Sequence, residues 1–144
     1  MTFRTVCVTV GAVVASLCGA ALFVSASTSI DQLGADIDGE AERDRFGDSV
    51  SLSSDGTIIA IGAEQNDGTA KNAGHVRVYE WNGSAWQQKG ADIDGEGLRD
   101  RSGSSVSLSS DGTILAIGAQ GNASNTGHVR VYEWNSGTSS WDQK

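Results

Sequence analysis

The feature that most constrains this chain is a segment of fifteen residues that occurs twice. Residues 49–63 read SVSLSSDGTIIAIGA, and residues 105–119 read the same letters with Leu115 in place of Ile59. In each copy, two runs with strand patterning flank a Ser-Ser-Asp-Gly turn, where the glycine accepts the positive φ that a tight hairpin requires. The sequence therefore predicts a β-hairpin that is repeated along the chain.

The repetition extends beyond this hairpin. Residues 34–40 (GADIDGE) return as residues 90–96 at a shift of 56, and residues 74–82 (GHVRVYEWN) return as residues 127–135 at a shift of 53. A period of about 55 residues, with length changes at only two places, indicates a repeat array whose length changes fall in loops.

Each period holds four segments with strand patterning: Phe46–Ser53, Thr57–Ala63, Gly74–Trp81 and Trp86–Ile93. The second is nearly all apolar, as in a strand covered on both faces, and the Asn82-Gly83 hairpin signal separates the last two. Outside the first 26 residues no segment has the period of 3.6 that marks an amphipathic helix. Four antiparallel strands in a repeated unit are typical of a β-propeller blade.

We therefore expect an all-β fold of two four-stranded antiparallel blades of propeller type, a partial β-propeller, preceded by a helical signal peptide. The expected parts are a signal peptide (1–26), the last strand of a preceding blade (27–37), a first blade (38–93) and a second blade that is incomplete at its end (94–144). Two blades do not close a ring, which takes about four to eight. We expect either a fragment of a longer propeller or a chain that self-associates to complete one.

The first 26 residues have the pattern of a secretory signal. Arg4 supplies the positive start, and the uncharged run Val6–Val24 leads to a Val-Ser-Ala cleavage pattern ending at Ala26. An uncleaved membrane anchor is the alternative, because the uncharged run approaches the length of a spanning helix. Cys7 and Cys18 both lie in this segment, so the mature chain would contain no disulfide and no thiol.

The net charge of the mature chain limits the kinds of partner that it can bind. Removal of Arg4 leaves nine Lys and Arg against 18 Asp and Glu, a net charge of −9. An acidic surface repels nucleic acid phosphates and anionic lipid head groups. We expect an extracellular protein or glycan as the ligand, no nucleic acid, and no membrane contact after signal cleavage.

Two sets of acidic residues raise the question of a metal. Asp36, Asp38 and Glu40, and their repeats Asp92, Asp94 and Glu96, either shape the turn that joins one blade to the next or bind calcium. The pairs Asp44-Arg45 and Asp100-Arg101 open the first strand of each blade, as ion pairs to a neighbouring blade or as solvated turn residues. We predict no metal ligand and no cofactor, with calcium kept as the open alternative.

The remaining candidate residues favour structural roles. His75 and His128 occupy the same repeat position at strand starts, and no motif supplies a nucleophile or acid to either, so we predict no catalytic residue and no enzyme. Four tryptophans flank the last hairpin of each copy (Trp81, Trp86, Trp134 and Trp141), where they pack across strands or stack on sugars. Asn82 and Asn122 begin glycosylation sequons, which matter if the source is eukaryotic.

The order of the short motifs resembles the FG-GAP repeat, the blade unit of integrin α-chain propellers. The resemblance rests on Phe46-Gly47, Val50-Ser51-Leu52, Asp55-Gly56, Ile61-Gly62-Ala63 and Gly74–Tyr79, and it covers residues 33–144. It implies a β-propeller that serves extracellular adhesion or ligand binding.

The chain departs from the family pattern at several positions. Ser102 stands where the second copy should have Phe, and Glu64 and Gln120 stand where the final Pro is expected. The Asp-rich loop of the calcium-binding members is reduced to residues 53–56, so the resemblance does not carry a calcium site to this chain. The leading functional hypothesis is a secreted, non-enzymatic binding or adhesion module. The alternative is a lectin-like surface protein that depends on carbohydrate or calcium.

Overall fold

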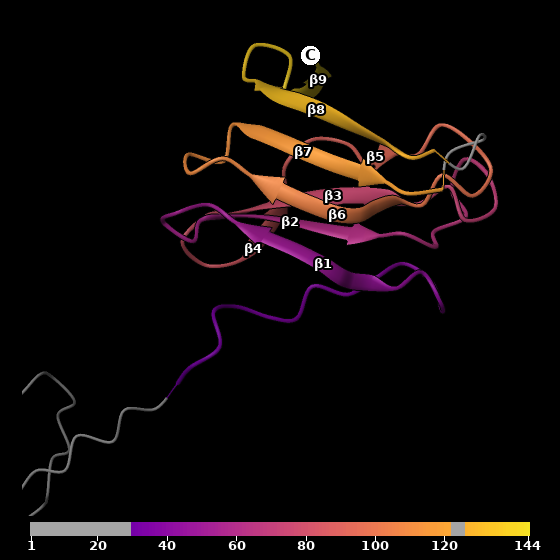
Figure 1. Cartoon of the computed structure of the whole chain (residues 1–144). Helices are drawn as coiled ribbons and strands as arrows, with labels where there is room; N and C mark the ends of the chain where they lie inside the picture. The colour runs from indigo at the N-terminus through magenta and orange to yellow at the C-terminus, as the bar shows by residue number, and fades with distance from the viewer. Residues whose placement is uncertain (1–29, 122–125) are drawn as a thin grey trace, which may run out of the picture. The chain divides into compact units, whose positions relative to one another are not determined.

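The computed structural model describes residues 30–121 and 126–144, which form strands, turns and loops with no helix among them. Two antiparallel sheets are present, as Figure 1 shows. The first has the order β1 (Phe46–Leu52), β2 (Ile58–Ala63), β3 (His75–Trp81) and β4 (Trp86–Gln88), and β5 (Ile93–Asp94) also pairs with β3. The second has the order β6 (Ser102–Leu108), β7 (Ile114–Ala119), β8 (His128–Asn135) and β9 (Ser140–Gln143). The prediction of two separate blade-like sheets is confirmed.

Both sheets belong to one compact unit, Leu33–Lys144. The predicted signal peptide, residues 1–26, lies outside the described residues. Within the described part of the chain, no helix has the length and apolar character needed to span a bilayer.

The turn of each repeated hairpin is organised by one aspartate. Asp55 Oδ1 accepts hydrogen bonds from Ser53 Oγ (2.6 Å) and from Thr57 N (3.0 Å) and Oγ1 (2.9 Å), and Gly56 takes a φ of 72°. The bonds from Ser53 and Thr57 lower the pKa of Asp55 to about 2. Asp111 makes the same bonds in the second copy. The repeated turn is therefore built from side chains that the sequence repeats.

The fourth strand differs from the expectation. Instead of one strand over residues 86–93, β4 and β5 pair with opposite ends of β3 and are separated by a break at Gly90, whose φ is 83°. A Cβ atom at Gly90 would lie 3.0 Å from the Trp134 ring and 3.1 Å from the Trp141 ring. The chain leaves the ladder here because it packs on the aromatic rings of the next sheet.

The described part of the predicted strand at 27–37 contains no strand. A β-strand needs a neighbouring edge for its backbone hydrogen bonds, and no preceding sheet is present in the described part of the chain. The carbonyl of Leu33 instead accepts a hydrogen bond from Trp86 Nε1 at 2.9 Å. Residues 33 and 34 thus pack on the first sheet in the way that residues 89 and 90 pack on the second.

The hydrophobic core lies between the two sheets. We call the side of each sheet that carries the residues equivalent to Val76 and Val78 its front face, and the opposite side its back face. The front face of the first sheet contributes Ile58, Ala60, Val76 and Val78, and the back face of the second contributes Val106, Leu108, Leu115, Ile117 and Tyr132. As the alternation in the sequence predicted, Val76 and Val78 lie on the opposite face of β3 from His75 and Arg77, and the face with the two valines forms the core.

Polar contacts fix how the two sheets meet. Ser49 Oγ donates to Gly103 O at 2.6 Å, and Ser51 Oγ accepts from Leu108 N at 2.9 Å. Gly103 has a φ of 85°, and a Cβ atom there would lie 2.5 Å from the His75 carbonyl oxygen. Backbone meets backbone at this point, which only glycine permits.

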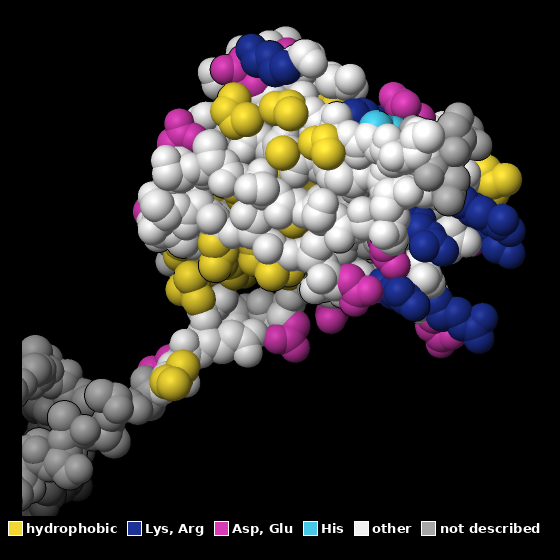
Figure 2. All heavy atoms as spheres, in the orientation of Figure 1, with side chains coloured by type: hydrophobic (Ala, Val, Ile, Leu, Met, Phe, Trp, Pro, Cys, Tyr) yellow, Lys and Arg dark blue, Asp and Glu magenta, His cyan; other side chains and the backbone are white. Residues whose placement is uncertain are grey.

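The outward faces of the pair carry exposed apolar side chains. Val50 and Leu52 on the back face of the first sheet are 59% and 55% exposed, and Val129 and Val131 on the front face of the second are 66% and 38% exposed. Figure 2 shows hydrophobic side chains gathered near β7 and β8 and again near β1. The two open apolar faces that the repeat analysis predicted are confirmed within the described part of the chain.

The core predicts a clear stability difference between two leucines. Leu115 is fully buried and Leu98 is 59% exposed. Leu115→Ala should lower the free energy of unfolding by about 2–5 kcal/mol, because it leaves a cavity between the sheets. Leu98→Ala should change it by less than about 0.5 kcal/mol. Urea denaturation of both variants checks this, and equal effects would show that the core is not where we place it.

Candidate functional site

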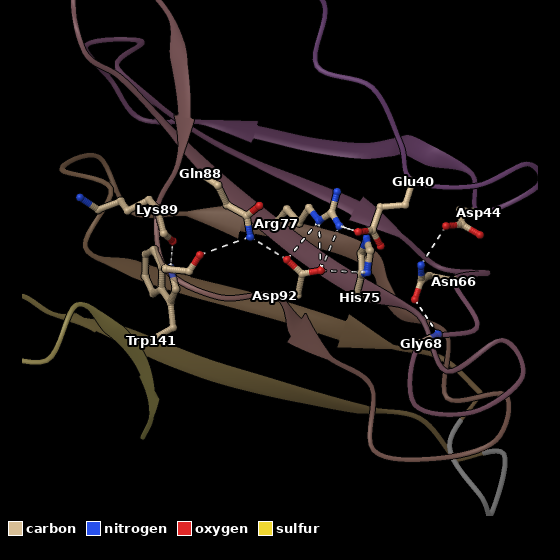
Figure 3. A network of polar contacts seen from close by, with 11 residues as sticks. Glu40, Asp44, Asn66, Gly68, His75, Arg77, Gln88, Lys89, Asp92 and Trp141 are labelled. Carbon is tan, nitrogen blue, oxygen red and sulfur yellow. Dashed lines mark hydrogen bonds and ion pairs between the residues drawn. The ribbon is translucent and has the colours of Figure 1, made fainter.

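Arg77 of β3 lies at the centre of a charged network, which we call the junction network (Figure 3). Its Nε is 3.1 Å from both carboxylate oxygens of Asp92, and its Nη2 is 3.1 Å from Asp92 Oδ2 and forms an ion pair with Glu40. Gln88 Nε2 donates to Asp92 Oδ1 at 2.6 Å, and His75 Nδ1 lies 3.8 Å from Asp92 Oδ2. Arg77 is 8% exposed, so these contacts form in a largely dehydrated place.

The local fold brings these residues together. The alternation of β3 puts His75 and Arg77 on the back face of the first sheet. The break at Gly90 ends β4, and the pairing of Ile93 with Val76 in β5 returns the chain to the edge of β3. Asp92 directly precedes this pair and therefore lies beside Arg77.

The charges of the network are mutually stabilised. Burial disfavours the charged form of Arg77, but the hydrogen bonds that Arg77 donates to Asp92 and Glu40 outweigh it and raise the pKa of the guanidinium. Burial likewise works against ionised Asp92, yet bonds from Arg77 and Gln88 lower the pKa of this carboxyl below its ordinary value. For His75, burial is the largest influence and lowers its pKa below 6.5 despite the nearby Asp92 charge. The network thus holds a charged Arg77 between two carboxylates, next to a neutral imidazole.

Glu40, His75 and Asp92 offer ligand atoms within 4.8 Å of one another, the separation at which a metal ion could be held. Arg77 is paired with both carboxylates of this group, and a cation would have to displace its guanidinium. The arrangement is therefore better suited to holding chain segments together than to binding a metal.

Of the two acidic strings that raised the calcium question, only Glu40 and Asp92 belong to a group of possible metal ligands among residues 30–121 and 126–144. In the second string, Asp92 meets Arg77 of the first sheet, whereas Glu96 lies 3.6 Å from Arg130 of the second. The Asp94 carbonyl also accepts from Arg130 Nη2, at 2.7 Å. Residues 90–96 thus connect the two sheets, which goes beyond the turn role that we considered.

Sequence reasoning missed the arginines of this network. Arg77 and Arg130 occupy one repeat position in the third strand, while the acids lie in a separate motif. The available signal was that each repeated acidic string is matched by a repeated arginine between two valines of the third strand.

The tryptophan pairs pack across their hairpins, as we favoured. Trp81 faces Trp86 and Trp134 faces Trp141, each pair with ring centroids 5.4 Å apart at an interplanar angle of 60°. Trp141 Nε1 donates to the Lys89 carbonyl at 2.9 Å. Lys89 Nζ lies 4.5 Å from the centre of the Trp134 ring. Each tryptophan pair thus packs against the chain segment that precedes its own sheet, residues 33–34 for the first sheet and residues 89–90 for the second.

The Arg-Asp-Arg sequences at 43–45 and 99–101 have a different role from either expectation. Asp44 and Asp100 are 6% and 4% exposed, so they are neither solvated turn residues nor cross-sheet ion pairs. Asp44 accepts from Asn66 Nδ2 at 2.8 Å, and Asp100 accepts from Gly97 N at 2.7 Å. Both aspartates are therefore internal acceptors that fix their own loops.

The flanking arginines point outward from strained backbone. Arg99 and Arg101 have φ values of 61° and 55°, a region that L-residues other than Asn and Asp seldom adopt. Both are exposed, and backbone bonds from Arg99 N to Lys71 O and from Arg101 N to Asn72 O anchor this loop to the β2–β3 loop. Figure 2 shows Lys and Arg side chains projecting at one end of the molecule, the end reached by the long loops in Figure 1. We call Lys71, Arg99 and Arg101 the basic loop patch.

No described acidic side chain forms an ion pair with a member of the basic loop patch. The net charge of −8 hid this local excess of cations from the sequence analysis. The recurrence of Arg-x-Arg in both repeats was the signal that could have revealed it.

The other candidate residues have simpler positions. Asn82 lies exposed in the β3–β4 turn, where its Oδ1 accepts from Ser84 N and Ala85 N, each at 2.9 Å. Glycosylation of Asn82 stays a prediction, and Asn122 lies outside the described residues. His128 opens β8, as His75 opens β3.

The buried His75 predicts a pH dependence of stability. Its pKa is below 6.5 in the folded chain, so the unfolded chain binds more protons as the pH falls past 6.5. The free energy of unfolding should therefore decrease from pH 7 to pH 5 and should depend less on pH in His75→Gln. Urea denaturation at several pH values checks this. An identical pH dependence in the variant would contradict the role of His75.

Comparison with known proteins adds the family. A model described as the FG-GAP repeat matches residues 35–79, which run from the first acidic string through most of β3. No curated protein matches the chain. Residues 91–132 repeat the matched segment in sequence and in strand order. The match is consistent with an FG-GAP repeat protein.

Proposed function

We propose that the chain is a secreted, non-enzymatic binding module of the adhesion type, whose ligand docks on the basic loop patch. The ligand would be an extracellular protein or glycan that carries acidic groups. The proposal is supported by the FG-GAP repeat and by the propeller-like sheets, which form a rigid base beneath the loops.

The observation that carries the proposal is the backbone conformation of Arg99 and Arg101. A left-handed conformation costs a non-glycine residue on the order of 1 kcal/mol, and glycine avoids this cost. Arginine here cannot be explained by backbone preference, since its side chain is exposed and forms no ion pair with described residues. The positions are best explained by what the guanidinium groups bind.

The shape of the patch favours a fixed ligand geometry. Asp100 is buried between the two arginines, and Gly121 N donates to its carbonyl at 3.0 Å. The backbone beneath Arg99 and Arg101 is therefore held from two sides. Two guanidinium groups on such a base suit bidentate contacts to carboxylate or sulfate groups.

The carbohydrate alternative through Trp86 has less support. The indole N–H of Trp86 is bonded to Leu33 O, and its ring packs against Trp81. A Cβ atom on Gly34 would lie 2.7 Å from the Trp81 ring. The tryptophan surfaces are thus engaged by the chain itself and are poorly placed to stack on a sugar.

Removal of the patch arginines should weaken binding while leaving the fold intact. Arg99→Gly and Arg101→Gly relieve the strained backbone, so the melting temperature should stay within a few degrees of the parent value. Binding to the acidic members of an array of extracellular proteins and of sulfated, sialylated and neutral glycans should weaken about tenfold per arginine.

The matched control is the double variant Arg99→Lys with Arg101→Lys, which keeps both charges on the strained backbone. It should retain more binding than the glycine variants. If the array shows no acidic ligand, or if the glycine variants bind as tightly as the parent chain, the basic loop patch is not the ligand site.

Secretion has its own test. Expression of the full chain with export in a suitable host should release a product whose N-terminal residue is Ser27, because the predicted cleavage follows Ala26. N-terminal sequencing of the released product checks this. A product that keeps residues 1–26 and stays with the membrane fraction would support the anchor alternative instead.

A further inference from the structure

Residues 90–96 contact both sheets with different side chains. Asp92 and Ile93 contact β3 of the first sheet, through Arg77 and through strand pairing. Gly90 lies against the tryptophan pair of the second sheet, and Glu96 pairs with Arg130 there. The middle of the GADIDGE sequence thus binds the preceding sheet, and its first glycine and last glutamate bind the following sheet.

The identical sequence at residues 34–40 has its following sheet but no preceding one among the described residues. Gly34 lies against Trp81 and Trp86, and Glu40 pairs with Arg77, as their repeats do one period later. In the middle of the segment, which would face a preceding sheet, Ile37 is only half-buried, whereas its repeat Ile93 is 7% exposed. Ile37 and Asp38 repeat the two residues of β5, but no strand pairs with them among the described residues.

The second sheet lacks, among the described residues, the strand that would pair with the start of β8. β9 pairs with β8 only from Tyr132 onward, whereas β3 is also paired at His75 and Val76 by β5. Arg130 is 9% exposed, and its Nε has no hydrogen-bond partner among the described residues. The equivalent Nε of Arg77 is bonded to Asp92. Arg130 keeps one carboxylate partner, Glu96, but a buried N–H without an acceptor is costly, so the position suits a second carboxylate that the described chain does not supply.

The open apolar faces are complementary in the same sense. Val106 and Leu108 pack on the front face of the first sheet, and their repeats Val50 and Leu52 are exposed. Val76 and Val78 receive them, and the repeats of those residues, Val129 and Val131, are exposed. Both kinds of surface that meet between the two sheets therefore occur a second time, exposed, on the outer faces of the pair, where they suit another contact of the same kind.

We propose that a second copy of this chain docks head to tail on the second sheet, with its residues 34–40 supplying the missing docking strand. Ile37 of the incoming copy pairs with Val129, Asp36 meets Arg130, and the back face of its first sheet covers Val131. This deepens the repeat-module architecture of the proposed function and does not depend on the ligand at the basic loop patch.

Residues 34–40 of the same chain do not supply this strand, because they are held on its own first sheet by the Trp86 and Arg77 contacts. The two surfaces of the contact are also on opposite faces of the pair of sheets. Such a contact is heterologous and leaves a free surface at each end, so association continues until a ring closes or a filament forms.

Site-specific disulfide formation tests the proposal. In the full chain with Cys7→Ser and Cys18→Ser, one preparation carries Ile37→Cys and a second carries Val129→Cys. Directly opposite residues on antiparallel strands have the Cα separation that a disulfide accepts. Mixing the two under mild oxidation should give the disulfide-linked pair about tenfold faster than random collision allows, because docking raises the effective concentration of the thiols.

The matched control replaces Val129→Cys by Val50→Cys, which is similarly exposed but lies on the far face. Circular dichroism confirms that each variant is folded. Faster linking with Val129→Cys than with Val50→Cys supports the proposal, and equal rates overturn it. Equal rates together with acidic-ligand binding that still depends on Arg99 and Arg101 would remove the association and leave the proposed function standing.

Discussion

The fold depends on one constraint: a sheet with two apolar faces cannot bury both of them alone. In this chain the front face of the first sheet and the back face of the second cover each other, and their contact contains the main hydrophobic cluster. The small residues at the contact allow this close approach, because Gly62 and Gly103 let backbone lie on backbone. Stability of a repeat unit is therefore a property of the pair of sheets and not of either sheet by itself.

Residues 90–96, which the junction network holds at the edge of the first sheet, supply direction to this contact. Apolar faces are non-directional and tolerate sliding, whereas the bidentate pairing of Arg77 with Asp92 fixes one register at the sheet edge. Because residues 90–96 contact the first sheet with Asp92 and the second with Glu96, they fix how these two sheets are related. The acidic strings are thus better understood as connectors than as calcium ligands.

Much of the fold could be predicted from the sequence, because the repeat reports long-range structure. The hairpin turn at Asp55, the faces of β3 and the tryptophan pairs all follow from local pattern. The break in the fourth strand could not be predicted, since it arises where Gly90 packs on rings that lie 44 and 51 residues further along the chain. The absence of a strand over the described residues 30–37 has the same origin, because a strand is defined by a partner edge that local sequence does not reveal.

The candidate sites were harder to predict than the fold. Counting charges made the chain uniformly acidic, yet the alternation of inward Asp100 with outward Arg99 and Arg101 separates the signs over three residues. Asp92 meets Arg77 of β3 and Gln88 of β4 only because the chain turns back to the edge of β3, so its lowered pKa and its ion pairing depend on the tertiary fold.

Native-state hydrogen exchange tests the central claim most directly. If the two sheets stabilise each other by front-to-back burial, the most protected amides of β2, β3 and β7 should open together with one free energy that falls equally with denaturant. A first sheet that keeps its protection while the second opens independently would contradict the account.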